Sequence, residues 1–458
     1  MPGLFDSLTM AARSLQAQQF AINVTGQNIS NVNTPGYSRR VTDFADVPMP
    51  AGGGVDVQGV RSIRDMLLER RLLAQVPLGT YDAAVADALA VVETSLGRTG
   101  DTLDARLNEF FDAFSDLAES PTSAVARREV QVAAEALATS FNETASRLEA
   151  NRTDADVRLR NSVDEINTIA TRIAEINAVL PSATANQGGL TLRDEQSALL
   201  RRLSELANVG TIGREDGGVD VTVGNGRPLV VGANAYALDT VPTAPSGYAA
   251  VMAGDFDITS EVSGGTVGGL LFVRDSAIPG YLASLDTLAS QTAASVNALH
   301  AGGYDLNGAG GGAFFSYALA PVGVAGAAAA LRVDPAIVSD NSLIAAAGVA
   351  LSGDNGTART IAALRNERVL NGNTATLGDG WGNLVYSVGS DVRSASNARD
   401  THETITREVD ALRDQVSGVS LDEEALNLLK FQRAYEANAK FFTAIDSMLE
   451  TLMNSYRP

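Results

Sequence analysis

The first thirty residues carry a regular stripe of apolar side chains. Alternating steps of four and three residues form one seam, and most of its members are apolar: Leu4, Leu8, Ala11, Leu15, Gln18, Ile22, Thr25 and Ile29. A repeat of 3.5 residues is typical of a helix that packs along a partner helix. The other positions are mainly Gln, Asn, Ser, Ala and Arg, and an isolated helix of this kind is marginal in water. The pattern therefore predicts a helix over residues 1–33 that needs a partner.

The end of the chain, residues 421–454, predicts a second helix with two neighbouring seams. The first seam contains Leu421, Ala425, Leu428, Gln432, Tyr435, Ala439, Phe442, Asp446 and Leu449. The second contains Phe431, Ala434, Asn438, Phe441, Ile445, Met448 and Leu452. Together they make an apolar stripe that is too wide for a two-stranded coil, so we expect this helix to be covered on more than one side.

Between the two ends, the pattern predicts further helices and one very long helix. Helical periodicity covers residues 61–97, with an interruption expected near Pro77, and residues 101–119, whose apolar face contains Leu103, Leu107, Phe110, Phe111, Phe114 and Leu117. Ser120 and Pro121 then read as a cap and a first helical residue. No Pro or Gly follows until Pro181. A continuous helix of that length spans roughly 90 Å and is typical of an elongated protein.

The composition changes at Asn208. Residues 209–270 are rich in Gly, Val and Thr, and "GVDVTVGNGRPLVV" alternates as short strands do, which predicts a small β region. Helical patterns return over 282–300, 357–370 and 388–416. The expected fold is mainly α with a β insertion, elongated and multi-domain, with the two terminal helices as each other's natural partners. The expected domains are a terminal coiled-coil domain, a helical-bundle domain and a β-rich outer domain: residues 1–40 plus 417–458, 41–207 plus 271–416, and 208–270.

A turn follows the first helix in "NISNVNTPGYSRR", residues 28–40. Pro35 fixes its own φ and Gly36 tolerates a positive φ, so Thr34 to Tyr37 reads as a type II turn. Asn31 and Asn33 can cap backbone groups where the helix ends. Local chemistry alone predicts only a helix stop before a loop.

Composition and charge exclude several classes of function. The chain has 458 residues and a formal net charge of −20, and no stretch is basic enough to bind nucleic acid. It contains no cysteine, which excludes disulfides and thiolate chemistry. No apolar run is long enough to cross a membrane, and the N-terminus lacks the pattern of a secretory signal peptide. Composition alone therefore predicts a cytoplasmic protein without membrane insertion.

Candidate catalytic groups are sparse. The chain has two histidines, His300 and His402, and neither stands in a metal-binding motif. The glycine-rich stretch 308–313 lacks the Gly-Lys-Ser/Thr of a phosphate loop. Adjacent carboxylates such as Glu423 and Glu424 are expected to be solvated acids in the first turn of a helix. We expect no catalytic residue, no metal site and no cofactor.

Both ends carry a family resemblance. "LFDSLTMAARSLQAQQFAINVTGQNISNVNTPGYSRR" and "SGVSLDEEALNLLKFQRAYEANAKFFTAIDSMLETLMN" resemble the terminal signatures of bacterial flagellar axial proteins. The variant "NTPGYSR" and the internal stretches "LRDEQSALLRRLSELANV" and "HAGGYDLNGAGGGAFF" are similar to the hook-associated protein 1 family, the first proteins of the hook–filament junction.

The resemblance implies a structural role. In this family the terminal helices pair as an inner domain that lines a tube, and the Asn-rich turn marks the exit to the outer domains. It implies an assembly seam on the first helix at Leu4, Leu8, Leu15, Ile22 and Ile29, and a turn motif at Asn28, Asn31, Asn33, Pro35, Gly36 and Tyr37. It also implies a surface on the last helix for assembly and for an export chaperone, at Leu421, Leu428, Tyr435, Phe442, Ile445 and Leu449.

The resemblance also implies partners and a location. A ring of copies would join the hook protein to the second hook–filament junction protein, after export to the extracellular flagellum without a cleaved signal peptide. This revises the cytoplasmic prediction. Three alternatives stay open: the second junction protein, the hook protein, and a flagellum-associated peptidoglycan hydrolase.

Overall fold

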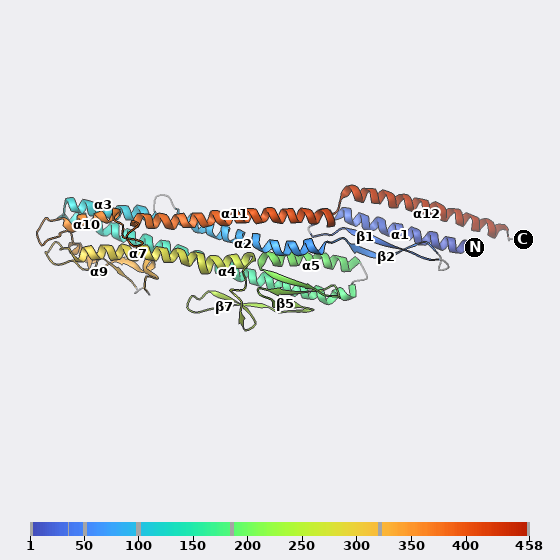
Figure 1. Cartoon of the computed structure of the whole chain (residues 1–458), viewed down its shortest axis with the longest axis horizontal. Helices are drawn as coiled ribbons and strands as arrows, with labels where there is room; N and C mark the ends of the chain where they lie inside the picture. The colour runs from blue at the N-terminus through green and yellow to red at the C-terminus, as the bar shows by residue number, and fades with distance from the viewer. Residues whose placement is uncertain are drawn as a thin grey trace.

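The protein is a long, narrow molecule with both chain ends at the same end, as Figure 1 shows. The computed structural model describes residues 3–34, 36–48, 53–97, 102–183, 187–318 and 323–455. The helices are α1 (Leu4–Ser30), α2 (Met66–Leu96), α3 (Leu103–Glu119), α4 (Ala124–Ala183), α5 (Gln187–Leu206), α6 (Gly265–Phe272), α7 (Ile278–Ala301), α8 (Ala327–Ala330), α9 (Pro335–Ser339), α10 (Gly356–Ala363), α11 (Leu377–Ser417) and α12 (Leu421–Ser455). A π-helical turn, Val273–Ala277, joins α6 to α7, and short 3-10 turns lie at Asn341–Leu343 and Leu364–Asn366.

All the strands lie in small antiparallel sheets. The strands are β1 (Arg40–Asp46), β2 (Val55–Ser62), β3 (Val209–Gly213), β4 (Val219–Val223), β5 (Arg227–Val231), β6 (Asn234–Ala235), β7 (Leu238–Pro242), β8 (Ala249–Ala253), β9 (Phe256–Asp257), β10 (Phe315–Tyr317) and β11 (Leu331–Val333). Their orders are β1-β2, β3-β4-β5-β6, β7-β8-β9 and β10-β11. The predicted fold class, mainly α with a β insertion, is confirmed.

The long helix α4 is the axis of the molecule. It contains 60 residues and therefore extends about 90 Å. Its start differs from the sequence prediction, because the hydroxyl of Ser123, not that of Ser120, accepts the N–H of Ala126 at 3.2 Å. Its end also differs, since Pro181 lies inside the last turn and the helix continues to Ala183.

The interruption expected near Pro77 is wrong. The helix α2 runs through this proline from Met66 to Leu96. Proline removes one backbone hydrogen bond and usually kinks an exposed helix. Here Pro77 is buried, and α2 packs along α11 and α6, so tertiary contacts keep the helix continuous.

Two hydrophobic cores divide the length of α4. One core joins its first half to α3, α7 and α11, and contains the predicted apolar face of α3. Phenylalanine rings fill its centre, with centroids 5.2 Å apart for Phe110 and Phe114 and 5.0 Å apart for Phe314 and Phe315. The other core joins the second half of α4 to α5, α6 and the sheets of residues 209–257.

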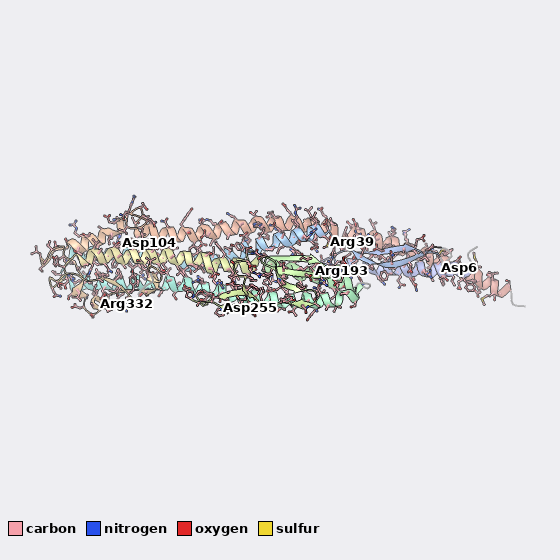
Figure 2. The ribbon with its side chains drawn as sticks, turned by 60° about the horizontal axis from the view of Figure 1, so that its bottom comes forward. Asp6, Arg39, Asp104, Arg193, Asp255 and Arg332 are labelled. Carbon is pink, nitrogen blue, oxygen red and sulfur yellow. The ribbon has the colours of Figure 1, made fainter. Side chains whose placement is uncertain are left out.

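The terminal helices pair, as predicted. Helix α1 lies between α12 and the hairpin β1–β2 (Figure 1). The fully buried side chains of α1 are small or polar: Ala11, Ala17, Ala21, Val24, Thr25 and Asn28. Figure 2 places Asp6 on this narrow part and Asp104 at the opposite end of the molecule.

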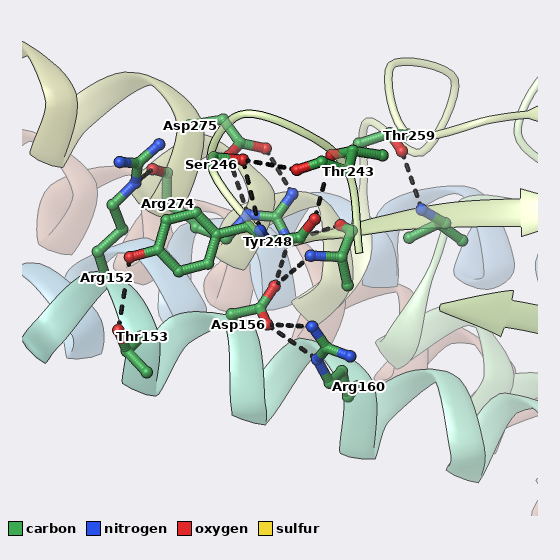
Figure 3. Close-up of polar contacts among 12 residues, drawn as sticks. Arg152, Thr153, Asp156, Arg160, Thr243, Ser246, Tyr248, Thr259, Arg274 and Asp275 are labelled. Carbon is green, nitrogen blue, oxygen red and sulfur yellow. Dashed lines mark hydrogen bonds and ion pairs between the residues drawn. The ribbon is translucent and has the colours of Figure 1, made fainter. Parts of the chain in front are cut away.

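A buried charge network fastens the β sheets to α4 (Figure 3). Arg274, from the π-helical turn, contacts Asp156 of α4 at 2.6 Å and donates to the carbonyl of Ala249 at 2.7 Å. Asp156 also accepts the N–H of Ala249 at 2.9 Å and the guanidinium of Arg160 at 2.8 Å. Burial alone would raise the pKa of Asp156, but these hydrogen bonds outweigh it and hold that pKa below its ordinary value. Asp156 is therefore a carboxylate that joins α4, β8 and the π-helical turn.

We predict that Asp156→Asn destabilises the protein by about 1–3 kcal/mol, because it removes the buried one of the two carboxylates that pair with Arg274 and leaves only the exposed Asp275. Urea unfolding followed by circular dichroism measures the change. Asp255→Asn, at an exposed turn of the same region, is the matched control and should change stability little. Equal free energies of unfolding for the two variants would contradict a stabilising role of Asp156.

Candidate functional site

The side chain of Asn28, near the end of α1, uses its full hydrogen-bonding capacity. It is 1 % exposed. Its amide donates to the carbonyl of Arg40 at 2.8 Å and to Oε2 of Glu424 at 2.9 Å. Its oxygen accepts the hydroxyl of Tyr37 at 2.8 Å and the N–H of Arg40 at 3.0 Å. Asn28 therefore connects β1 and α12 to the turn at residues 34–37, which we call the exit turn.

Glu424 connects Asn28 and Arg39 to the C-terminal helix α12. Its Oε1 accepts from Nε of Arg39 at 2.8 Å, and the side chain is 2 % exposed. Arg39 also pairs with Glu423 at 2.8 Å, and its N–H donates to the carbonyl of Ser417, at the end of α11, at 2.9 Å. The expectation that Glu424 is a solvated acid is wrong, because the carboxylate is buried against two donors.

A second carboxylate, that of Asp194 on α5, connects these residues to the helical body of the molecule. Arg40 contacts it at 2.9 Å and also donates to Thr191 at 3.1 Å. Arg64, just after β2, contacts Asp194 and donates to Ser38 at 3.0 Å and to Ser197 at 2.8 Å. We call these residues, centred on Asn28, Arg39, Arg40, Arg64, Asp194 and Glu424, the exit hub.

The exit turn has the predicted geometry where the structure describes it. Gly36 has φ of +80°, and the N–H of Tyr37 donates to the carbonyl of Thr34 at 3.2 Å. Pro35 lies outside the described residues. The side-chain amide of Asn31 donates to the carbonyl of Gln27 at 2.8 Å, and its oxygen accepts the hydroxyl of Thr34 at 3.2 Å. Asn33 is exposed.

Tyr37 enters the hub as a neutral donor. Burial raises the pKa of its hydroxyl, Arg40 acts against the rise, and Asp194 and Glu424 add to it. The guanidinium of Arg40 lies over the ring, 5.0 Å from its centroid. The hydroxyl therefore keeps its proton and donates it to Asn28.

The exit hub is the place where the narrow terminal part meets the wider body; Figure 2 labels Arg39 there. Hollows flank the exit turn on two sides, one bounded by α11 and one by α5. Two further ion pairs tie α11 to the body nearby: Arg201 with Asp410 at 2.8 Å and Arg413 with Glu69 at 2.9 Å. This arrangement connects α1, α5, α11 and α12 where they meet.

The predicted seam of α1 borders its buried face. Each of its five large residues is half-buried: Leu4, Leu8, Leu15, Ile22 and Ile29. On α12, the predicted positions divide among three environments. Ile445 is buried, Leu428, Phe442 and Leu449 are half-buried, and Leu421 and Tyr435 are exposed. An assembly role for these residues stays a prediction.

Sequence reasoning missed most of the hub. Two adjacent arginines in "YSRR" were the visible signal, since the start of a strand beside a buried helix is an unusual place for two cations. Asp194 carried no signal, because its partners lie far away in sequence.

The histidines have structural partners. His300 is buried; its Nδ1 lies 2.8 Å from the carbonyl of Gly312, and its Nε2 accepts the N–H of Ala345 at 2.8 Å. His402 lies between two long helices, with Nδ1 2.7 Å from Gln75 and Nε2 3.6 Å from Asp82. Within the described residues, no group of three or more His, Asp or Glu side chains could hold a metal ion. No described helix is long and apolar enough to cross a membrane.

Comparison with known proteins indicates the family. Residues 89–315 match the flagellar hook-associated protein FlgK helical domain, residues 8–37 the flagella basal body rod protein family, and residues 414–455 the flagellar basal body rod FlgEFG protein C-terminal family. The flagellar hook-associated protein 1 of Bacillus subtilis is 28% identical over 99% of both chains, and that of Escherichia coli is 24% identical over 97% of this chain and 98% of its own. Along nearly its whole length the chain is similar to the flagellar hook-associated protein 1 family.

The match in structure agrees with the family. The flagellar hook junction protein FlgK from Burkholderia pseudomallei superposes with a TM-score of 0.68, at 16% identity, and the match covers 76% of this chain and all of that one. At this identity the likeness shows the fold alone. The two terminal family matches meet at the exit hub. Asn28 and Tyr37 fall in the match at residues 8–37, and Glu424 falls in the match at residues 414–455.

We predict that Asn28→Asp disrupts the exit hub at pH 7. The change replaces the amide donor with an oxygen 2.8 Å from the carbonyl of Arg40 and 2.9 Å from the carboxylate of Glu424, so attraction becomes repulsion. Each buried group left unpaired costs about 1–3 kcal/mol. Hydrogen exchange at residues 37–41 and 421–426 should accelerate.

The matched control is Asn23→Asp, at an exposed position of the same helix, which should leave exchange unchanged. Protection in the Asn28→Asp variant should partly return near pH 4, where carboxylates bind protons. Wild-type exchange in that variant at pH 7 would refute the role of Asn28.

A second prediction concerns pH and His300. Burial lowers the pKa of this imidazole, with Arg127 adding to the effect and the carbonyl of Gly312 and the charge of Asp305 opposing it. The folded state therefore binds the proton more weakly than the unfolded state, whose ordinary value is 6.5. Stability from neutral His300 is fully present above that value and is lost as pH falls through the lowered pKa.

Urea unfolding at pH 7.5 and at about pH 5.5 should show this loss, and each tenfold difference in proton affinity corresponds to about 1.4 kcal/mol. His300→Gln should reduce the dependence between these two values, whereas His402→Gln should retain it. An unchanged pH dependence in His300→Gln would contradict the assignment.

Proposed function

We propose that this chain is a structural adaptor of the bacterial flagellum, in which a ring of copies joins the hook to the filament. Similarity to the hook-associated protein 1 family supports this function. Its partners would be other copies of itself, the hook protein and the second hook–filament junction protein. It would reach the flagellum by export without a cleaved signal peptide and would bind an export chaperone in the cell.

The observation that carries the proposal is the unpaired outer face of α12. Its inner face packs on α1, where Ile445 is 5 % exposed. Leu426 and Leu429, near the start of the helix on the side away from α1, are exposed by 68% and 50%. Met448, one turn from Ile445 and beside the buried face, is exposed by 58%. Exposed apolar surface of this kind is typical of an interaction site, because removing it from water is favourable. We expected α12 to be covered on more than one side, and a neighbouring molecule is needed to cover its outer face.

Two residues of the implied assembly surface, Phe442 and Leu449, are already half-buried in the single chain, where α12 packs on α1. The assembly surface on this helix is therefore better represented by Leu426, Leu429 and Met448.

Rigidity is the property that the exit hub supplies. A ring transmits torque from the hook to the filament only if each subunit keeps its inner helices fixed relative to its body. The buried carboxylate of Glu424 and the half-buried carboxylate of Asp194 connect the terminal pair to α5 and to the end of α11 through charged hydrogen bonds. Such bonds are shorter and stronger than neutral ones.

A hydrolase is not favoured by the charged groups. A sugar-cleaving enzyme of this kind needs two carboxyl groups across a substrate, one with a raised pKa. Burial raises the pKa of Asp82 and His402 opposes the rise, but this acid faces a histidine across the contact of α2 and α11. The pair serves helix packing.

Gene deletion tests the proposal. Cells that lack the chain should make complete hooks without filaments, and the wild-type chain should restore filaments. The double variant Leu426→Ser and Met448→Ser should keep the melting temperature of the monomer, because both side chains are exposed, but should fail to restore filaments. Secreted chain must be measured separately, since the same face can bind the chaperone.

Val125→Ser is the matched control, because Val125 is also 68% exposed but lies on α4. It should restore filaments fully. Cells without hooks would favour a hook protein instead, and normal filaments in the deletion strain would overturn the adaptor function.

A further inference from the structure

Side chains of asparagine close several strand edges in this protein. The amide of Asn28 binds both the N–H and the carbonyl of Arg40, at the start of β1. Asn167 of α4 binds both groups of Leu238 on β7, each at 2.8 Å. Asn297 of α7 binds both groups of Phe315 on β10, at 2.8 and 2.9 Å. Unpaired edges promote pairing with other chains, so closing them prevents unwanted contacts.

The outer edge of β3 is left open. The N–H of Arg214 donates to Gly218 at 2.9 Å, and that of Gly224 donates to Asn208 at 3.1 Å. In an antiparallel pair, alternate residues bond to the partner strand. The register with β4 therefore turns the backbone groups of three residues to the other side: Val209, Thr211 and Gly213. Within the described residues, these groups have no hydrogen-bond partner.

This edge faces a groove with an apolar floor and a basic rim. Thr211 and Gly213 line one side, and the floor and far side include Met66, Leu73 and Leu200. Four arginines line it: Arg64, Arg70, Arg193 and Arg214. Asp194 pairs with Arg64, and Asp216 and Asp220 pair with Arg214. The one acid of the lining, Glu69, is paired with Arg413 at 2.9 Å. Within the described residues Arg70 and Arg193 form no ion pair, so in a chain of net charge −20 they make this part of the rim positive beside a free strand edge.

A free edge of opposite charge lies on the hairpin. The N–H of Val47 donates to Gly54 at 2.9 Å, which turns the backbone of Phe44 and Asp46 away from β2. Both side chains are exposed. Residues 41–60 contain three aspartates and no lysine or arginine: Asp43, Asp46 and Asp56. Asp43 is paired with Arg61 at 2.9 Å, so Asp46 and Asp56 carry the unpaired negative charge of the hairpin. The hairpin lies along α1, on the far side of the exit hub from most of α5, so the outer half of β1 and the groove belong to different parts of one copy (Figure 1).

We propose that the outer half of β1 of one copy pairs with the open edge of β3 of the next copy, with the carboxylate of Asp46 toward Arg70 and Arg193. An added strand gains backbone hydrogen bonds, and its side chains occupy pockets of the groove. The charges select the partner and its direction. Two different surfaces meet in this contact, and contacts of that type form a ring when the rotation between successive copies closes. The inference rests on the proposed function, in which copies assemble side by side.

Disulfide cross-linking in intact flagella tests the pairing, because the natural chain contains no cysteine. Three double variants combine Thr211→Cys with Phe44→Cys, Ala45→Cys or Asp46→Cys. Successive side chains of a strand point to opposite faces. Oxidation should therefore give multimers of the chain in an alternating pattern, with position 45 behaving oppositely to positions 44 and 46.

Two controls sharpen the test. Thr211→Cys with Tyr386→Cys, an exposed site on α11, should give no multimers. Arg70→Glu in the best cross-linking pair should lower the yield several-fold, whereas Arg71→Glu, at an exposed neighbour outside the groove lining, should not.

The outcomes separate this inference from the proposed function. Two results would overturn the strand pairing and leave the adaptor role intact. In the first, flagella that carry filaments and contain the double variants give no multimers on oxidation. In the second, all three hairpin positions give equal yields of multimers. A photoreactive phenylalanine at position 211 that attaches to a different flagellar protein would also overturn it. Absence of the chain from flagella would refute the proposed function itself.

Discussion

The orientation of the terminal helices depends on one buried carboxamide, that of Asn28. A primary amide offers two donors and an oxygen with two lone pairs, and here all four sites are used. No other side chain of this size can donate to a carbonyl and a carboxylate while accepting from a hydroxyl and a backbone N–H. The amide thus determines where β1 begins, how Tyr37 returns to the helix, and where Glu424 lies. The arginines then connect these points to α5 and α11.

The same chemistry recurs wherever a short strand meets a long helix. Strands of three to five residues in sheets of two to four are not stable alone in water. Asn177 of α4 takes the place of a missing strand by binding both backbone groups of Val219, at 2.8 and 3.0 Å, and the carbonyl of Gly232 at 2.7 Å. A helix that carries such amides can hold small sheets without a large core beneath them. This is how a largely helical rod supports side structures along its length.

Periodicity in the sequence was enough to find most of the helices and was much less informative about the hub. It missed α6, which lies within the predicted β region, and the start of α11 at Leu377, which was predicted near residue 388. The apolar faces of α3 and α12 follow from local spacing, because a helix repeats over residues that are neighbours in sequence. The turn at Gly36 follows from local chemistry too. In contrast, the buried state of Glu424 depends on Arg39 and Asn28, nearly four hundred residues away in sequence, so the same acid reads locally as an ordinary first-turn residue. Continuity through Pro77 also depended on distant contacts, those of α6 and α11.

The burial pattern of α1 explains why polar contacts, rather than apolar area, fix the terminal pair within one chain. Its buried apolar positions are mainly Ala11, Ala17 and Ala21, whose methyl groups allow close approach but remove little surface from water. Its larger residues, such as Leu8, Leu15 and Ile22, remain half-buried. Fully burying a leucine or isoleucine contributes about 1.5–3 kcal/mol, so much of the hydrophobic free energy of this helix is unused in the single chain. The exit hub fixes the orientation of the terminal pair, and the side chains that stay half-buried leave apolar surface in water. In the proposed assembly, contacts with neighbouring copies would remove this surface from water, so the terminal helices would gain most of their stability only there.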